Sequence, residues 1–83
     1  MIMIEVKKAK YLKEYKIWLE FNDGTNGVVD LHPNLWGDMF EPLKEIDLFK
    51  NFKISDDFNT INWENGADLA PEYLYNKVNA NIF

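Results

Sequence analysis

The chain has 83 residues, a length that suits one small domain, and it contains no Cys, which excludes disulfide bonds and thiolate metal sites. Its hydrophobic content of 47% is sufficient for an apolar core without such cross-links. Acidic residues number 14 against 9 basic ones, all of them Lys, for a net charge of −5. This balance and the absence of Arg disfavour nucleic-acid binding by this chain alone, because the phosphate backbone attracts cations and Arg makes the best bidentate contacts.

The beginning of the chain predicts a cytoplasmic protein. The stretch MIMIEVKK has too few apolar residues before its first charge for the core of a secretion signal. No apolar run approaches the length of a membrane-spanning helix. We therefore expect no membrane association. We expect the acidic surface either to favour a basic protein partner or simply to keep the protein soluble.

Two strands are predicted in the first quarter of the chain. Ile2, Ile4 and Val6 alternate with other residues, which is the period of a strand with one buried face. The same alternation is clearest at 15–21, where Trp18 falls on the side opposite the apolar residues.

The middle of the chain predicts a hairpin return, a loop and a helix. The turn residues of NDGTNG (22–27) lead into a strand at 28–31. Residues 32–40 are loop-like, with one helical turn expected at 33–36. A helix is expected over 42–51, because Pro42 suits its first position and apolar residues recur on one side. Those residues are Leu43, Ile46 and Phe49.

The last third predicts two short strands, at 52–54 and 60–63, and a terminal helix that begins at Pro71. Its core-facing residues are expected to be Tyr73, Leu74 and Val78. The predicted order is β-β-β-α-β-β-α. We therefore expect a single small α+β domain over residues 1–83, with a largely antiparallel sheet of about five strands and two short helices.

The segment from Asp68 to Glu72 predicts a structural fastener between the turn at Asn65-Gly66 and the terminal helix. The residue before a proline avoids the helical region, so Ala70 should be the N-cap and Pro71 the first helical residue. Glu72 suits the positive end of the helix dipole. The carboxylate of Asp68 is expected to bond the amides of the turn or of the helix.

Several motifs resemble a known family. They are FNDGTNGVVDL (21–31), FEPLKE (40–45), LF (48–49) and INWENGADLAPEYLY (61–75). In this order and spacing they resemble the bacterial domain-of-unknown-function family numbered 2442, over nearly the whole stretch from Ile4 to Tyr75. The last block is the most specific. Ala70 departs from the pattern, because many members carry Ser there.

The resemblance implies a fold like the N-terminal domain of a Nitrosomonas member, with an antiparallel sheet and helices packed against it. It implies little about activity. Many members are similar to one half of a toxin–antitoxin pair, being encoded beside a second small protein. Others resemble fusions to a helix-turn-helix domain, and we expect no such domain here because only eight residues follow Tyr75.

Exposed aromatic residues are the main candidates for function. Trp18 shares its side of the second strand with Lys16 and Glu20, so it is either an interface anchor or covered by the terminal helix. Trp36 and Met39 in the middle loop pose the same question. The leading interpretation is a non-enzymatic interaction module, an antitoxin-like or regulatory partner of a second small protein, with Trp18, Trp36 and Met39 as its contact residues.

Two other interpretations stay open. One is a small ligand-binding domain or enzyme that uses Asp30, His32 and Asp68; the other is a building block of a homo-oligomer. His32 is the only His, and the spacing of Asp30, His32 and Asp38 does not follow a calcium loop, so no metal or cofactor is expected. The single Ser and single His do not make a catalytic triad.

Overall fold

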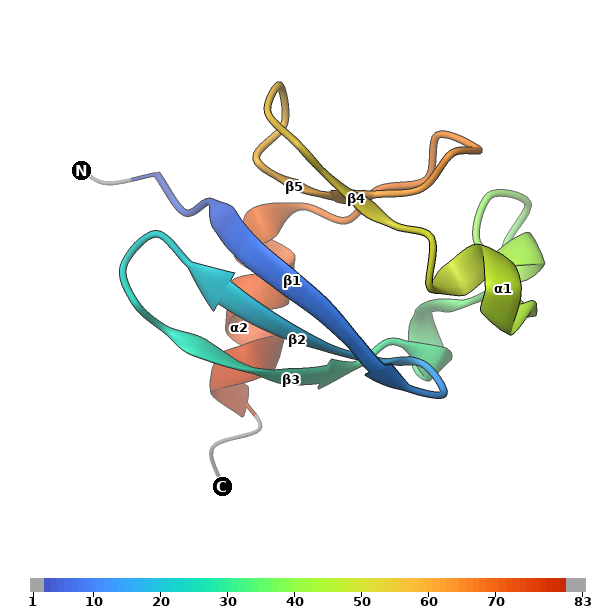
Figure 1. Ribbon diagram of the computed structural model, residues 1–83, viewed down its shortest axis with the longest axis horizontal. Helices are drawn as coiled ribbons and strands as arrows, with labels where there is room; N and C mark the ends of the chain where they lie inside the picture. Colours follow the sequence, from blue (N-terminus) through green and yellow to red (C-terminus); the bar gives the residue numbers. More distant parts are fainter. Residues whose placement is uncertain (1–2, 81–83) are drawn as a thin grey trace.

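A three-stranded antiparallel sheet forms the first half of the protein, whose computed structural model describes residues 3–80 (Figure 1). Its strands are β1 (Val6–Lys13), β2 (Lys16–Phe21) and β3 (Asn26–Asp30), and they lie side by side in this order. The alternation in β2 is the cause: Ile17, Leu19 and Phe21 are buried, whereas the residues between them are partly exposed. The predicted hairpin of β2 and β3 is confirmed.

The first strand begins later than its alternation predicted. Ile4 is half-buried against the core but lies before β1, and Ile2 lies outside the described residues. The strand runs instead through the Lys-rich stretch Val6–Lys13, which pairs with β2. Ala9 and Tyr11 are opposite buried residues of β2, so the inward positions of β1 are apolar even though its sequence is mostly polar.

The helix expected over 42–51 is wrong, because the chain divides it into two short turns. A 3-10 helix, η2 (Glu41–Lys44), is followed by an extended residue, Glu45 (ψ 115°), and then by α1 (Ile46–Phe49). In a continuous α-helix, Leu43 and Phe49 would point about 120° apart. The break at Glu45 lets both side chains reach the core, where they are 3% and 0% exposed.

The remaining strands form a second sheet, so the five predicted strands do not share one. β4 (Lys53–Ser55) pairs with β5 (Thr60–Asn62), and the backbone of Asp68 forms an isolated bridge to Asn62. The amide of Val6 donates to the carbonyl of Asn59 at 2.9 Å, which joins the two sheets. The predicted order β-β-β-α-β-β-α is nonetheless confirmed.

The last helix, α2 (Pro71–Ala80), covers one face of the first sheet and begins at the predicted residue (Figure 1). Leu74 and Val78 stand one turn apart and are buried. Tyr73 was expected in the core but is 45% exposed, because it points about 100° around the helix from Leu74. A short 3-10 helix, η1 (His32–Asn34), begins the loop that faces Tyr73.

The hydrophobic core lies between this face of the sheet, α2 and the η2–α1 segment. Its buried members come from every part of the described chain. They are Val6, Ile17, Leu19, Phe21, Val29, Leu31, Leu35, Leu43, Phe49, Ile61, Trp63, Ala67, Leu74 and Val78.

Candidate functional site

The face of the first sheet that carries Trp18 is turned away from α2. Leu19 is opposite Gly27 of β3, and a Cβ at Gly27 would approach the side chain of Val78 in α2. Side chains alternate along a strand, so Trp18 lies on the other face, which Figure 1 shows in front of the helix. The alternative that the terminal helix covers Trp18 is therefore wrong.

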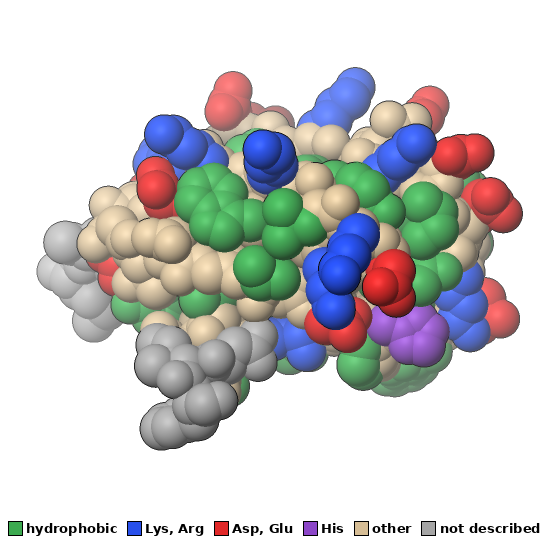
Figure 2. Space-filling view, turned by 60° about the horizontal axis from the view of Figure 1, so that its bottom comes forward, with side chains coloured by type: hydrophobic (Ala, Val, Ile, Leu, Met, Phe, Trp, Pro, Cys, Tyr) green, Lys and Arg blue, Asp and Glu red, His purple; other side chains and the backbone are tan. Residues whose placement is uncertain are grey.

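Lysines surround the partly exposed Trp18 on this outer face. Trp18 is opposite Lys10 of β1 and Val28 of β3, and Lys16 and Glu20 share its side. On the side of the molecule where β3 lies, Figure 2 shows hydrophobic side chains grouped among Lys side chains. Glu20 and Asp30 lie on the same face, so it presents apolar side chains among both Lys and acidic residues.

A second apolar surface, which we call the Trp36 groove, lies on the side of α2. Trp36 is 73% exposed and lines a hollow of about 390 Å³ together with Asn34, Phe40, Leu69 and Tyr73. The loop after η1 and the first turn of α2 supply its two exposed rings. Trp18 and Trp36 therefore belong to separate surfaces and not to one.

The floor of the Trp36 groove is held by Asn34. Its Nδ2 donates to the hydroxyl of Tyr73 at 2.6 Å, which ties the loop to α2. Its Oδ1 is buried and accepts no hydrogen bond from any described residue. A buried acceptor without a donor is unfavourable, so this oxygen lowers the stability of the loop.

Acidic residues flank the Trp36 groove in the sequence. Asp38 follows Trp36 by two positions, Asp68 precedes Leu69, and Glu72 precedes Tyr73. All three acids are exposed, and none forms an ion pair with a described residue. The segments that supply the groove are therefore acidic, although none of these acids lines it.

Met39 lies in the same loop as Trp36 and is 45% exposed. Its carbonyl accepts a hydrogen bond from Nδ2 of Asn65 at 2.8 Å, so the loop is tied to the turn after β5. Its methyl group lies beside Gly66, where an added Cβ would be 3.4 Å away. Met39 therefore adjoins the turn and does not line the groove.

The hydrogen bonds that were predicted for the Asp68 side chain are made by other residues of this loop. The Asp68 carboxylate is exposed and forms no hydrogen bond within residues 3–80, whereas its backbone bridges to Asn62. The turn amide of Ala67 donates instead to Oδ1 of Asn65 at 3.0 Å. The hydroxyl of Thr60 donates to the carbonyl of Leu69 and adds a further tie.

Pro71 and Glu72 occupy the first turn of α2 as expected, and the amide of Leu74 donates to the carbonyl of Ala70 at 3.2 Å. Ala70 thus provides the first helical acceptor from the N-cap position. The side chain of Glu72 is exposed and has no hydrogen-bond partner among the described residues.

The residues of the ligand-site alternative are divided. Asp30 and His32 line a shallow hollow of about 200 Å³ with Glu14, Tyr15 and Lys16, but Asp68 does not line it. Oδ1 of Asp30 accepts the amide hydrogen of His32 at 3.0 Å, and the Tyr15 ring packs 5.1 Å from the imidazole. These contacts give both Asp30 and His32 a structural role in the loop. Within residues 3–80 no three acidic or His side chains are grouped to hold a metal ion.

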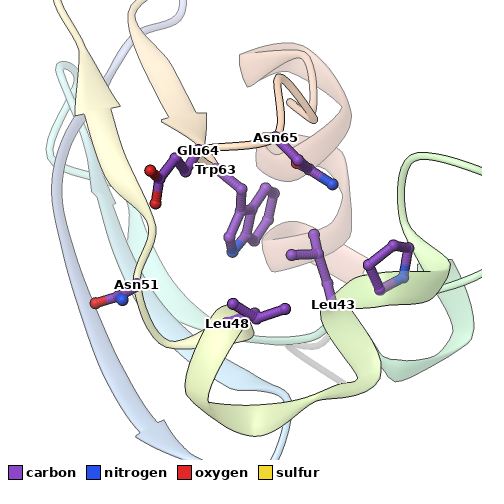
Figure 3. Close-up of a pocket in the computed structure, with 7 residues that line it drawn as sticks. Leu43, Leu48, Asn51, Trp63, Glu64 and Asn65 are labelled. Carbon is purple, nitrogen blue, oxygen red and sulfur yellow. The ribbon is translucent and has the colours of Figure 1, made fainter.

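The residue pattern did not identify a third hollow, which we call the Trp63 pocket. Trp63 was expected only as the end of a strand, but its ring faces an open space below the turn at 64–65 (Figure 3). Pro42, Leu43 and Leu48 of the η2–α1 segment line the opposite wall. The break at Glu45 forms this wall, and no sequence pattern indicated that break.

Comparisons with known proteins give one match. Within the described residues, no helix has the length and apolar character needed to cross a membrane. No curated protein and no solved structure matches the chain. A family described as a protein of unknown function, DUF2442, matches residues 6–80, which is most of the sequence. The motifs at 21–31, 40–45 and 61–75 all fall within that match, and the chain belongs to the DUF2442 family.

Proposed function

We propose that this domain is a cytoplasmic protein-interaction module, an antitoxin-like or regulatory partner of a second small protein, and that the Trp36 groove is its contact surface. The observation that carries the proposal is the 73% exposure of Trp36 beside a hollow that also presents Tyr73. Large aromatic side chains at the centre of an interface supply much of its binding energy.

The Trp36 groove is better suited to a protein than to a reaction. Its two exposed rings offer apolar area that a partner could cover. The acids Asp38, Asp68 and Glu72 favour a partner with Lys or Arg near its apolar contact, and such a cation could also stack on the rings.

The test is co-purification from the native host with tagged wild-type protein, followed by measurement of affinity for the captured protein. Trp36→Ala should weaken binding about 30-fold or more, because truncating an anchor of this kind costs about 2 kcal/mol. Its thermal melt should stay unchanged, since Trp36 is not part of the core.

Phe58→Ala is the matched control, because Phe58 is 66% exposed and lies in the turn between β4 and β5. It should bind as the wild type does. Equal binding by Trp36→Ala would contradict the proposal and return attention to Trp18 on the outer face. Self-association that Trp36→Ala abolishes, with no second protein captured, would favour the homo-oligomer instead. Higher salt should weaken binding to a basic partner.

A further inference from the structure

We propose that the Trp63 pocket is a second binding site, which takes an extended basic peptide segment of another protein. One large apolar side chain of that segment would lie against Trp63, and a Lys or Arg beside it would pair with Glu64. The site shares no lining residue with the Trp36 groove, so the proposal goes beyond the function proposed above.

The apolar end of the site has the size of one side chain. Its volume is about 240 Å³, below the roughly 300–1,000 Å³ of pockets for drug-sized ligands. Leu43 and Trp63 are 3% exposed and form its floor, whereas Leu48 is 49% exposed at its edge. Figure 3 shows Leu43 and Leu48 directed toward the Trp63 ring across the open space.

The pocket is preformed because the Trp63 ring is fixed. Its indole N–H donates to the carbonyl of Phe49 at 2.7 Å, and the two rings lie 5.8 Å apart. Phe40 and Phe52 pack edge-on against the same indole at 6.2 and 6.4 Å. Trp63 therefore cannot rotate to fill the space, and a ligand would bind without the cost of ordering it.

A polar hollow of about 520 Å³ extends the site. It shares Asn51, Trp63 and Glu64 with the pocket and adds Phe52, Lys53 and Asn62. The side-chain amides of Asn51 and Asn62 form no hydrogen bond within residues 3–80. Each amide has a donor and an acceptor, as a peptide group does. An extended backbone crossing this hollow would therefore find complementary partners.

Charge selects a basic segment. Glu64 is the one charged side chain that lines both hollows, and it has no ion pair among the described residues. Figure 3 shows Glu64 and Asn51, which line both hollows, on the same side of Trp63. The net charge of −5 attracts a cationic segment over longer range. Lys53 lines only the polar hollow, where it would face peptide carbonyls.

The experiment titrates three capped peptides into the full chain and follows the Trp63 indole N–H by two-dimensional NMR. The first peptide is acetyl-Ser-Leu-Lys-Ser-amide; the others replace its Leu by Ala or its Lys by Glu. The first should shift the Trp63 signal with a millimolar Kd. Removing the Leu side chain should weaken binding about tenfold or more, and reversing the charge about threefold or more.

Two variants test the site itself. Leu48→Asp should abolish the shift, whereas Leu12→Asp should not, because Leu12 is similarly exposed (44%) but lies on β1. Glu64→Gln should reduce the preference for Lys over Glu while the Leu peptide still binds more tightly than the Ala peptide. No shift with any peptide, equal shifts with all three, or binding that survives Leu48→Asp would overturn the proposal. Trp36→Ala should leave these titrations unchanged, which separates this site from the Trp36 groove.

Discussion

Asn65 and Asp68 stand three positions apart in one loop but differ in their contacts. The Asn65 side chain accepts from the amide of Ala67 and donates to the carbonyl of Met39, so it joins its own turn to the middle loop. The Asp68 side chain bonds to no described residue, although its backbone bridges to Asn62. The side chain that holds this loop in place is therefore that of Asn65 and not that of Asp68.

Asn65→Ala should lower the free energy of unfolding by about 1–2 kcal/mol, because it removes one hydrogen bond within the turn and one that joins the turn to the middle loop. Asp68→Ala should change it by less than about 0.5 kcal/mol, as exposed substitutions do. Urea unfolding of both variants provides the measurement. A larger loss from Asp68→Ala than from Asn65→Ala would show that the carboxylate holds the loop.

The sequence predicts elements well where one element carries its own pattern. The alternation in β2 and the proline at the start of α2 are local signals, and both elements form as expected. β1 was placed too early because its inward residues, Ala9 and Tyr11, are separated by Lys and become a strand only by pairing with β2. The break at Glu45 depends on where Leu43 and Phe49 must point, which only the assembled core determines.

The candidate sites also differ in whether a local stretch of sequence could indicate them. Trp36 was identifiable as a candidate from the sequence because it lies in a predicted loop, and it is 73% exposed. The Trp63 pocket was not identifiable from the sequence, because its walls come from η2, α1 and the turn after β5. No single stretch of sequence contains a pattern for a space enclosed by three segments.

The packing of α2 on β3 depends on one small residue. A Cβ at Gly27 would lie 2.8 Å from Cγ1 of Val78, closer than real side chains approach. Gly27→Ala should therefore cost about 1–3 kcal/mol, as overpacking a core contact does. Thermal or urea unfolding would measure the loss.

A double variant provides the control for this element. Removing the clashing methyl groups with Val78→Ala should make Gly27→Ala less costly in that background than alone, which gives a coupling free energy between β3 and α2. If the losses in unfolding free energy of the two single variants simply add, Gly27 is required for its backbone conformation and not because a Cβ would contact Val78.

At the scale of the whole molecule, Asp23 and Tyr75 join the first sheet to the last helix. The hydroxyl of Tyr75 donates to Oδ2 of Asp23 at 2.6 Å across 52 positions of sequence, and the Tyr75 ring packs edge-on against Phe21. The hydrogen bond from Tyr75 and a second from the amide of Thr25 lower the pKa of Asp23 below its usual 3.8. Both donors favour the charged carboxylate.

This lowered pKa predicts how the stability of the fold responds to acid. A carboxyl group with a depressed pKa in the folded state stabilises the protein above its unfolded pKa of 3.8, and that contribution is lost as the pH falls through the lowered value. Tyr75→Phe keeps the ring contact but removes the hydroxyl. Its deficit in unfolding free energy should be largest near neutral pH and should shrink below pH 3.8.

Tyr73→Phe is the matched control, because the hydroxyl of Tyr73 accepts a hydrogen bond from Asn34, whereas that of Tyr75 donates to the Asp23 carboxylate. Its stability difference from the wild type should not vary over the same pH range. If the loss of unfolding free energy in Tyr75→Phe is also independent of pH, the hydroxyl of Tyr75 does not stabilise the charged form of Asp23.

The position of α2 after the sheet that it covers affects the protein during its synthesis. The ribosome releases β1, β2 and β3 before the helix exists, so the inner face with Ile17 and Leu19 emerges without its cover. That face stays open while the segment between Asp30 and Pro71 is translated at roughly 5–20 residues per second. For several seconds the nascent chain thus presents an apolar surface that a chaperone could bind and that the finished protein conceals.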